Sequence, residues 1–318
     1  MRRKASSPSR RSESLSTEGA SGVATTKVMS MRDAIARFVP DGSSVALGCA
    51  LEPAIPFSAG HELIRQRRRD LTLIGPISDI LFDQLIGAGC VAKVVAAWVG
   101  NVSAGLAHCY RRAREQGIPR RIEVVDHSNF SIGLALLAGA LGAPYIPTKT
   151  LLGSDICHTN PTLREATDPF SGERIVLVPA IRPNVTIVVA QRADADGNAQ
   201  LWGPWGVSEE AALAANRVIV VADELVDGDV IGEDPNATLV PAPKASAVVI
   251  ETGAAHPSPL QGRYRRDHEF FHEYHRGTRA MQGFDAWLSE WVTGVPDRAA
   301  YIAKLGARWT SLRDAPRV

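Results

Sequence analysis

Four polar side chains follow one another directly after an apolar run that ends at residue 125. They are Asp126, His127, Ser128 and Asn129, and a strongly apolar stretch, 132–141, comes next. A strand followed by a helix is expected here, and capping that helix needs only Ser128 or Asn129. The surplus of polar groups at a strand end favours a binding function for His127, Ser128 and Asn129.

A Ser–His hydrolytic pair is the first chemistry that His127 and Ser128 suggest. Neighbouring residues at the end of a strand point apart, and the chain has no G-x-S-x-G nucleophile elbow. We therefore do not expect a serine hydrolase.

The turn after the first expected strand is a second candidate site. Gly48 allows close backbone approach, Cys49 and Glu52 follow it, and Pro53 and Pro56 stiffen the entry to a helix. The free N–H groups of that helix suit an anion or a developing oxyanion. An ordinary strand-to-helix turn explains the same residues, and the turn lacks the G-x-G-x-x-G pattern of a dinucleotide site.

Two further segments complete the candidate binding residues. Asn101 follows Gly100 after a strand and could orient a carbonyl group, although Asn after Gly is equally typical of a turn. Gly153, Ser154 and Asp155 form a turn in which glycine frees backbone N–H groups.

No metal site is expected. His268, His272 and His275 share one helical face with Glu269 and Glu273. Zinc binding is conceivable for such a face, but a solvated His/Glu surface explains it more simply.

The elements that position these residues alternate between strands and helices. Strands are expected at 44–50, 71–74, 91–98, 122–125, 175–179, 185–190, 218–221 and 247–250. Helices are expected at 55–69, 80–88, 106–115, 132–141 and 209–215. This alternation predicts an α/β fold with an open, largely parallel sheet flanked by helices. Residues 227–243 are expected to form a long surface loop, and residues from 267 onward to form helices.

Composition limits the class of protein. Residues 1–30 form a basic Ser/Arg-rich stretch that predicts a disordered tail, and residues 31–318 predict a single domain. A net charge of +1 gives no reason to expect nucleic acid or an acidic membrane as a partner. No C-x-x-C pair or signal peptide accompanies the four cysteines, so a reducing, cytoplasmic location is expected.

In the order of its segments, the chain resembles the alpha-type subunit of family I coenzyme A transferases, of the glutaconate coenzyme A-transferase kind. The resemblance covers roughly residues 30–300 and rests on the following segments: Leu47-Gly48 with Pro56, 126–130, 138–147, 152–155, and the D-x-x-G-N turn 194–198.

That resemblance implies a fold of the ribose-phosphate-isomerase/CoA-transferase kind and an obligate beta-type partner, in a heterodimer or a dimer of heterodimers. It also implies that a glutamate of the partner attacks an acyl-CoA thioester, forming an acyl-glutamyl anhydride and then a glutamyl-CoA thioester. Coenzyme A then passes to a second carboxylic acid. By the same resemblance, the alpha-type chain is expected to supply the wall of the acyl pocket and no catalytic residue. CoA is then a substrate, and no other cofactor is expected.

Two departures from the family pattern keep other functions open. Glu52-Pro53-Ala54 stands where many relatives carry basic residues, which argues against glutaconate as the substrate. A ring-opening CoA-ester hydrolase of this family uses an acidic residue near the position of His127 to Asn129, where this chain offers only Asp126. CoA-ester hydrolysis, with Glu52 or Asp126 positioning water, is therefore the first alternative, and a non-catalytic acyl-CoA-binding module is the second.

Overall fold

The structure is a computed structural model that describes residues 26–313. Most of the predicted tail lies outside the described residues. Residues 26–30, however, lie against the sheet: Val28 forms a parallel bridge with Val248, and the Met29 N–H donates to the Val248 carbonyl at 2.9 Å. The predicted tail boundary at residue 30 is therefore too late in the chain.

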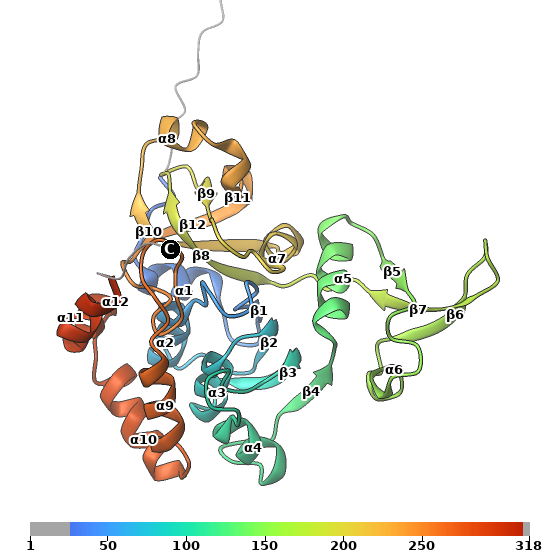
Figure 1. Ribbon diagram of the computed structural model, residues 1–318, viewed down its shortest axis with the longest axis horizontal. Helices are drawn as coiled ribbons and strands as arrows, with labels where there is room; N and C mark the ends of the chain where they lie inside the picture. The colour runs from blue at the N-terminus through green and yellow to red at the C-terminus, as the bar shows by residue number, and fades with distance from the viewer. Residues whose placement is uncertain (1–25, 314–318) are drawn as a thin grey trace, which may run out of the picture.

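A nine-stranded sheet forms the centre of the molecule (Figure 1). Its strands are β1 (Ser44–Ala46), β2 (Leu71–Ile77), β3 (Val91–Trp98), β4 (Glu123–Asp126), β8 (Val185–Ala193), β9 (Ala199–Gln200), β10 (Arg217–Leu225), β11 (Thr238–Val240) and β12 (Ala245–Ile250). Seven of them run parallel in the order β12-β10-β8-β1-β2-β3-β4, and only β9 and β11 pair antiparallel. The predicted open, largely parallel α/β sheet is confirmed.

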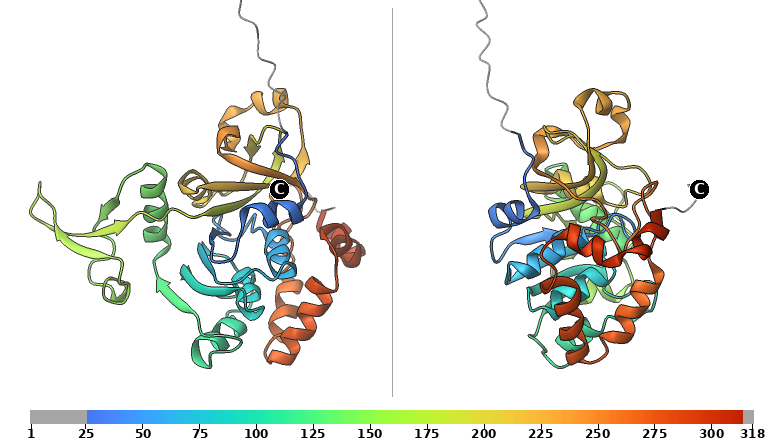
Figure 2. Two further views of the ribbon diagram at one scale, coloured as in Figure 1. Left: turned by 180° about the vertical axis from the view of Figure 1, so that it is seen from behind. Right: turned by 90° about the vertical axis from the view of Figure 1, so that its left-hand side faces the viewer.

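A second, three-stranded sheet projects from this body, as Figure 1 and the view from behind in Figure 2 both show. It consists of β5 (Tyr145–Thr148), β6 (Arg164–Thr167) and β7 (Arg174–Pro179), all antiparallel, in the order β5-β7-β6. The run 175–179 is thus a strand, but the expectation that it belongs to the parallel sheet is wrong. Its apolar residues instead pack on helix α5 (Asn129–Ala140), since Val176, Val178 and Ala135 share one buried cluster. The single domain over 31–318 stays a prediction.

The remaining helices surround the sheet and confirm the predicted ones within a few residues. They are α1 (Met31–Phe38), α2 (Phe57–Arg65), α3 (Ile80–Gly87), α4 (His108–Glu115), α6 (Asp155–Thr159), α7 (Ser208–Ala214), α8 (Gly228–Gly232), α9 (His268–Gly277), α10 (Met281–Leu288), α11 (Arg298–Leu305) and α12 (Ala307–Arg313). Short 3-10 turns occupy η1 (Pro235–Ala237) and η2 (Ala242–Lys244), and a π-helical turn occupies η3 (Ser289–Thr293). None of the helices in residues 26–313 is long and apolar enough to cross a membrane.

The predicted loop 227–243 is wrong in part, because it contains α8, η1 and β11. Gln200 supplies the physical reason. Its buried side-chain amide donates to the carbonyls of Ile231 and Asp234, and its backbone pairs with Thr238. These tertiary bonds order a segment whose Gly, Pro and Asp content is typical of a loop.

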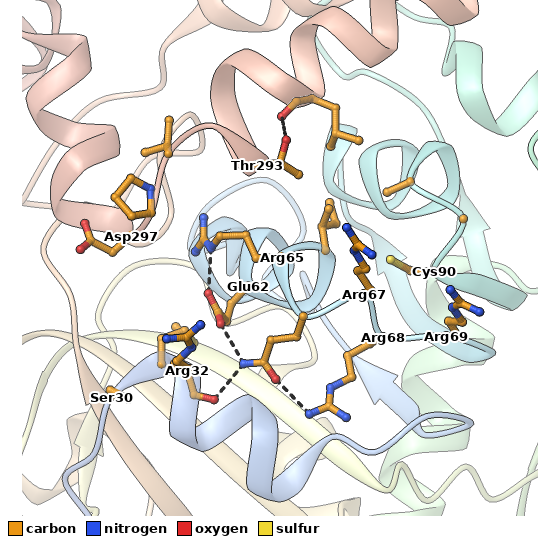
Figure 3. Close-up of a pocket in the computed structure, with 18 of the residues that line it drawn as sticks. Ser30, Arg32, Glu62, Arg65, Arg67, Arg68, Arg69, Cys90, Thr293 and Asp297 are labelled. Carbon is orange, nitrogen blue, oxygen red and sulfur yellow. Dashed lines mark hydrogen bonds and ion pairs between the residues drawn. The ribbon is translucent and has the colours of Figure 1, made fainter.

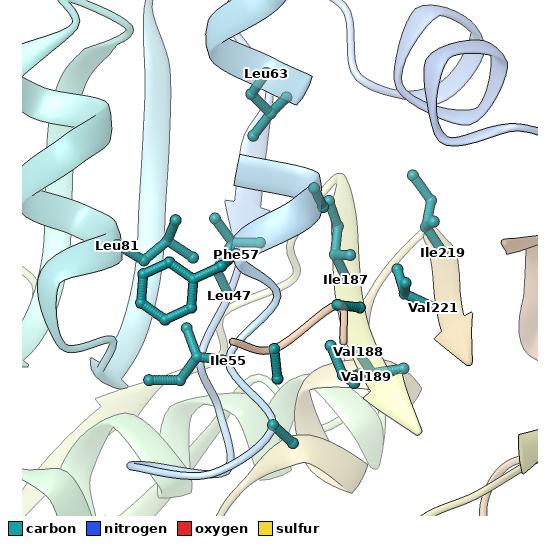
Figure 4. Packing of buried hydrophobic residues seen from close by; sticks show 14 of the residues in the cluster. Leu47, Ile55, Phe57, Leu63, Leu81, Ile187, Val188, Val189, Ile219 and Val221 are labelled. Carbon is teal, nitrogen blue, oxygen red and sulfur yellow. The ribbon is translucent and has the colours of Figure 1, made fainter. Parts of the chain in front are cut away.

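The core divides between the two faces of the sheet, because successive side chains of a strand point to opposite sides. Val45 and Leu73 face the larger cluster, which includes Phe57 of α2 (Figure 4). Ala46 and Ile74 face the opposite cluster, which Ile132 and Leu136 of α5 and Ala211 of α7 complete. Helix α5 therefore covers the face opposite α2, close to the loops that follow the strands.

Candidate active-site edge

The loops that follow β1, β2, β3 and β4 meet at one edge of the sheet, because these four strands are parallel neighbours. This edge holds seven of the ten predicted site residues: Gly48, Cys49, Glu52, Asn101, His127, Ser128 and Asn129. Gly153, Ser154 and Asp155 lie instead at the start of α6, in the projecting part.

Gly48 locks the first two of these loops together. It has a φ of +65°, and an added Cβ would lie 2.9 Å from the Cα of Ser78, after β2. The Ser78 hydroxyl donates to the carbonyl of Leu47 at 2.8 Å. Only glycine accommodates both the left-handed backbone and this close approach.

The Cys49 side chain packs inside the protein. Its side chain is buried in the cluster beneath α5, and its carbonyl accepts from the Val207 N–H at 2.8 Å. Gly206 passes so close that a Cβ there would lie 2.3 Å from the Cys49 oxygen. Burial raises the pKa of the Cys49 thiol to about 12, so the thiol is protonated at neutral pH and is a poor nucleophile.

Glu52 is exposed at the tip of the same loop. The Ser258 hydroxyl donates to the Glu52 carbonyl, and the Ala54 N–H donates to the Pro259 carbonyl at 2.9 Å. Leu51 and Ala54 have φ values of +74° and +52°, a region that non-glycine residues rarely adopt. Such strain is often found at functional loops, and here residues 258–259 hold it in place.

Asn101 is buried, and its side chain is fully engaged within the protein. Its amide nitrogen donates to the Phe271 carbonyl at 2.9 Å, and its side-chain oxygen accepts from the N–H groups of Ser103 and Ala104. This network fixes the turn after β3 against α9. The role of Asn101 in binding stays a prediction.

His127 joins two parts of the chain. Asn160 donates both to the Asp126 carbonyl at 2.8 Å and to Nε2 of His127 at 3.2 Å, so Nδ1 of His127 carries the proton and donates to the Ser131 hydroxyl at 3.1 Å. Burial lowers the pKa of His127 to about 4. The neutral imidazole therefore ties the start of α5 to the end of α6.

A pH-dependent stability follows from His127. Its pKa is lower in the folded chain than in the unfolded chain, so unfolding takes up a proton between pH 6.5 and 4. The stability that depends on a neutral His127 is fully present above pH 6.5 and is lost as the pH falls to 4. His127→Gln should reduce the slope of unfolding free energy against pH by up to about 1.4 kcal/mol per pH unit in this window. The exposed residue His158 provides the control, and an equal slope in His127→Gln and His158→Gln would contradict the assignment.

Ser128 and Asn129 have different environments. The Ser128 side chain accepts from the Ser131 N–H at 3.0 Å, and the Ser131 hydroxyl accepts from the Ser128 N–H at 2.9 Å. This reciprocal capping box explains Ser128 as the N-cap of α5. Asn129 begins the helix and is exposed, so its side chain is free to meet a ligand.

The turn at Gly153 lies in the projecting part, just before α6. Gly153 has a φ of +78° and is exposed, and the Ser154 hydroxyl donates to the Leu151 carbonyl at 2.7 Å. Asp155 is the exposed first residue of α6. Because Asn160 fastens the end of α6 to the end of β4, the two predicted clusters belong to one connected region.

A buried ion pair at this edge went unpredicted. Asp79, two residues after β2, is buried with a φ of +47° and pairs with Arg266. Burial raises the pKa of Asp79, and the Arg266 guanidinium opposes that shift. Arg266 also stacks 3.9 Å over the Phe271 ring. The position of Asp79 after a strand could have pointed to it. The predicted strand ended at residue 74, however, because proline is rare inside strands and Pro76 follows.

Within residues 26–313, no three His, Cys, Asp or Glu side chains are grouped as metal ligands. A large cavity lined by arginines lies elsewhere, beside the loops before β2 and β3.

Comparison with known proteins decides the family. A family model described as coenzyme A transferase matches residues 28–251. The chain belongs to the coenzyme A transferase family. The A-type subunit of the 3-oxoadipate CoA-transferase of Pseudomonas knackmussii is 39% identical over 279 residues, which is 88% of this chain and 98% of the relative. The A-type subunit of the glutaconate CoA-transferase of Acidaminococcus fermentans is 32% identical over 307 residues, 91% of this chain and 95% of the relative.

Solved structures agree with this assignment. The crystal structure of the Acidaminococcus fermentans glutaconate coenzyme A-transferase matches with a TM-score of 0.86 and 31% identity, covering 92% of this chain and 96% of that chain. A chain of the decarboxylase AibA/AibB matches with a TM-score of 0.72 and 29% identity, covering 83% and 99%. This CoA-transferase chain is an alpha-type subunit of a heteromeric enzyme, and the named relatives do not favour the hydrolase or binding-module alternatives.

Proposed function

We propose that this alpha-type subunit forms one wall of an acyl site whose attacking carboxylate comes from a glutamate of a beta-type partner. CoA would move from an acyl-CoA to a free carboxylic acid, with CoA as a substrate and no further cofactor. The observation that carries the proposal is the chemical state of the edge. At this edge, burial keeps the Cys49 thiol protonated. The His127 imidazole is neutral, and both of its nitrogens are hydrogen-bonded within the protein. Neither of these two groups is a ready nucleophile, which supports an attacking carboxylate supplied by the partner.

Asn129 is the residue at this edge best placed to touch the acyl group, and its replacement tests the proposal. Asn129→Ala should lower kcat of the assembled enzyme by about tenfold or more, since an amide that orients a reacting carbonyl acts in the transition state. Its free energy of unfolding should change by no more than about 0.5 kcal/mol, because the side chain is exposed.

Two further variants sharpen this test. Ser128→Ala removes the helix cap and should cost about 1 kcal/mol of unfolding free energy. Asn236→Ala changes another exposed asparagine, in η1, and should leave turnover unchanged. Unchanged kinetics of Asn129→Ala in a folded complex would refute its place in the acyl wall.

Glu52 indicates the kind of acyl group. Its exposed position on a loop whose backbone is anchored by Ser258 and Pro259 sets a negative charge at the edge. A carboxylate here disfavours an acyl chain with a second carboxylate nearby, so we propose that acyl groups with uncharged tails are preferred.

A substrate panel tests this preference. Glu52→Gln should raise kcat/KM for dicarboxylic acyl-CoA esters about fivefold relative to uncharged ones, from the loss of roughly 1 kcal/mol of repulsion. Glu115→Gln, an exposed glutamate of α4, is the control. The same substrate ratio in both variants would remove Glu52 from the site.

The proposed complex is a heterodimer or a dimer of heterodimers. Support comes from exposed apolar side chains on α5 and the projecting part: Phe130, Leu141, Tyr145 and Phe170 are 56%, 69%, 46% and 97% exposed. Apolar surface of this kind is typical of protein interfaces. The mass of the purified complex separates the two stoichiometries.

A cytoplasmic location belongs to the same proposal. It is supported by the four cysteines, all of which are free.

A further inference from the structure

An arginine-lined groove lies away from the candidate active-site edge. It has a volume of about 1000 Å³ and runs between α1, the end of α2, and the segment from Leu288 to Asp297. In its wall, Arg69 lies two residues before β2 and Cys90 directly precedes β3. The groove therefore opens at the amino ends of these strands, whereas Gly48 and Asn129 lie at their carboxyl ends.

The backbone that carries the arginines is fixed. Arg67 has a φ of +54°, which turns the chain sharply out of α2. The N–H groups of Arg67 and Arg68 donate to the carbonyls of Ile64 and Leu63, and the Arg69 N–H donates to the Asp41 carboxylate at 2.9 Å. Three consecutive arginines are thus held on a rigid, strained turn, where a glycine would be the easier residue.

Two cations of the groove have internal partners. Arg65 donates to Glu62 at 2.8 Å, and Arg68 donates to the Gln66 side chain at 2.9 Å, as the dashed lines in Figure 3 show. Gln66 in turn donates to Glu62, so each oxygen of this carboxylate accepts a hydrogen bond.

Three other cations have no such partner. Within residues 26–313, no acceptor bonds the guanidinium groups of Arg32, Arg67 or Arg69, and Nε of Arg68 is buried without a partner. Figure 3 shows Arg67 and Arg69 on the side of Cys90, with Arg32 across the groove on α1.

Within residues 26–313, the acids of the lining form no ion pair with Arg32, Arg67 or Arg69. Asp297 caps α11, accepting from the Ala300 N–H at 2.8 Å. Counting every acid of the lining as charged, Glu62, Glu251 and Asp297 still stand against five arginines. The groove therefore has a surplus of positive charge, and its volume lies in the range of small-molecule sites.

We infer that this groove binds a small multivalent anion, with phosphate or carboxylate groups held by the guanidinium groups of Arg32, Arg67 and Arg69. Planar guanidinium groups bind both kinds of oxyanion through paired hydrogen bonds, and three unpaired cations match a ligand with at least two negative charges. The inference goes beyond the proposed transfer reaction and does not depend on it.

Calorimetry on the full chain at constant ionic strength tests the inference, with pyrophosphate and citrate as separate probes. We expect saturable binding of at least one probe. Binding of pyrophosphate alone assigns phosphate groups, and binding of citrate alone assigns carboxylates. The double variant Arg67→Gln/Arg69→Gln should weaken binding at least about tenfold.

The control is Arg111→Gln/Arg276→Gln, which removes two exposed arginines from α4 and α9 and gives the same change in net charge. It should bind as the wild type does. Absence of binding by both probes, unchanged affinity in the groove variant, or equal weakening in the control variant would each overturn the inference. Because Arg67 and Arg69 are exposed, the groove variant should fold, and its circular dichroism spectrum checks this.

Discussion

Arg266→Ala is expected to lower the free energy of unfolding by about 3–5 kcal/mol, because it leaves the Asp79 carboxylate buried without its cation. The guanidinium also bonds the Ser103 hydroxyl and stacks on Phe271, so its loss removes packing as well as charge. Chemical denaturation of the wild type and the variant measures the difference. Turnover should fall as well, since Asp79 directly follows Ser78, which contacts the Gly48 loop.

A double substitution separates the ion pair from the packing. Asp79→Asn/Arg266→Met removes both charges while filling most of the volume. It should therefore be more stable than Arg266→Ala, because an unpaired buried charge costs more than the loss of the whole pair. A free energy of unfolding for Arg266→Ala within about 1 kcal/mol of the wild-type value would contradict a stabilising role for the ion pair.

Gly48→Ala is expected to cost about 2–5 kcal/mol of unfolding free energy, in two parts. A left-handed backbone costs roughly 1–2 kcal/mol for a residue with a Cβ, and overpacking adds about 1–3 kcal/mol, because the new methyl group meets the backbone of Ser78 at 2.9 Å. The displaced loop should also move Glu52, so kcat/KM of the assembled enzyme should fall more than stability alone predicts.

Gly42 offers a matched control at the opposite end of β1. Its φ is +78°, similar to that of Gly48, but an added Cβ would meet no atom within 4 Å. Gly42→Ala should therefore show the backbone cost alone and retain normal turnover. Equal losses of stability and activity in the two variants would mean that the contact with Ser78 has no effect on the site.

The sequence predicts the parallel sheet well, because its strands are continuous apolar runs separated by amphipathic helices. It does not predict the antiparallel projection. The run 175–179 looks like any buried strand, and only its partners β5 and β6 place it outside the main sheet. The helix α8 and strand β11 were missed for a similar reason: Gln200 orders them through bonds to distant carbonyls, which no local pattern records.

For the candidate site, the structure tests where the predicted residues lie, and their role in binding stays a prediction. The strand-end rule correctly brings Gly48, Glu52, His127 and Asn129 to one edge. It cannot tell Ser128, whose side chain caps a helix, from Asn129, whose side chain is exposed. Burial and hydrogen-bond partners decide this difference, because Ser128 exchanges hydrogen bonds with Ser131 of the same helix.

The family motif at 194–198 shows the same limit. In the structure Asp194 accepts from the N–H groups of Asp196, Gly197 and Asn198, and Asn198 accepts from the Ala242 N–H. These bonds explain the spacing as a tight turn that fixes β8 to a later loop. The spacing of this motif is therefore accounted for by the turn's own hydrogen bonds.

The central claim is that this chain completes a transferase whose nucleophile is a glutamate of the beta-type partner. The most direct measurement mixes the co-purified complex with an acyl-CoA, adds borohydride, and maps the reduced residue by mass spectrometry. The account predicts loss of activity only when acyl-CoA is present, with one reduced glutamate on the partner and none on this chain. Release of free acid without any reduced glutamate, or a reduced residue on this chain, would contradict it.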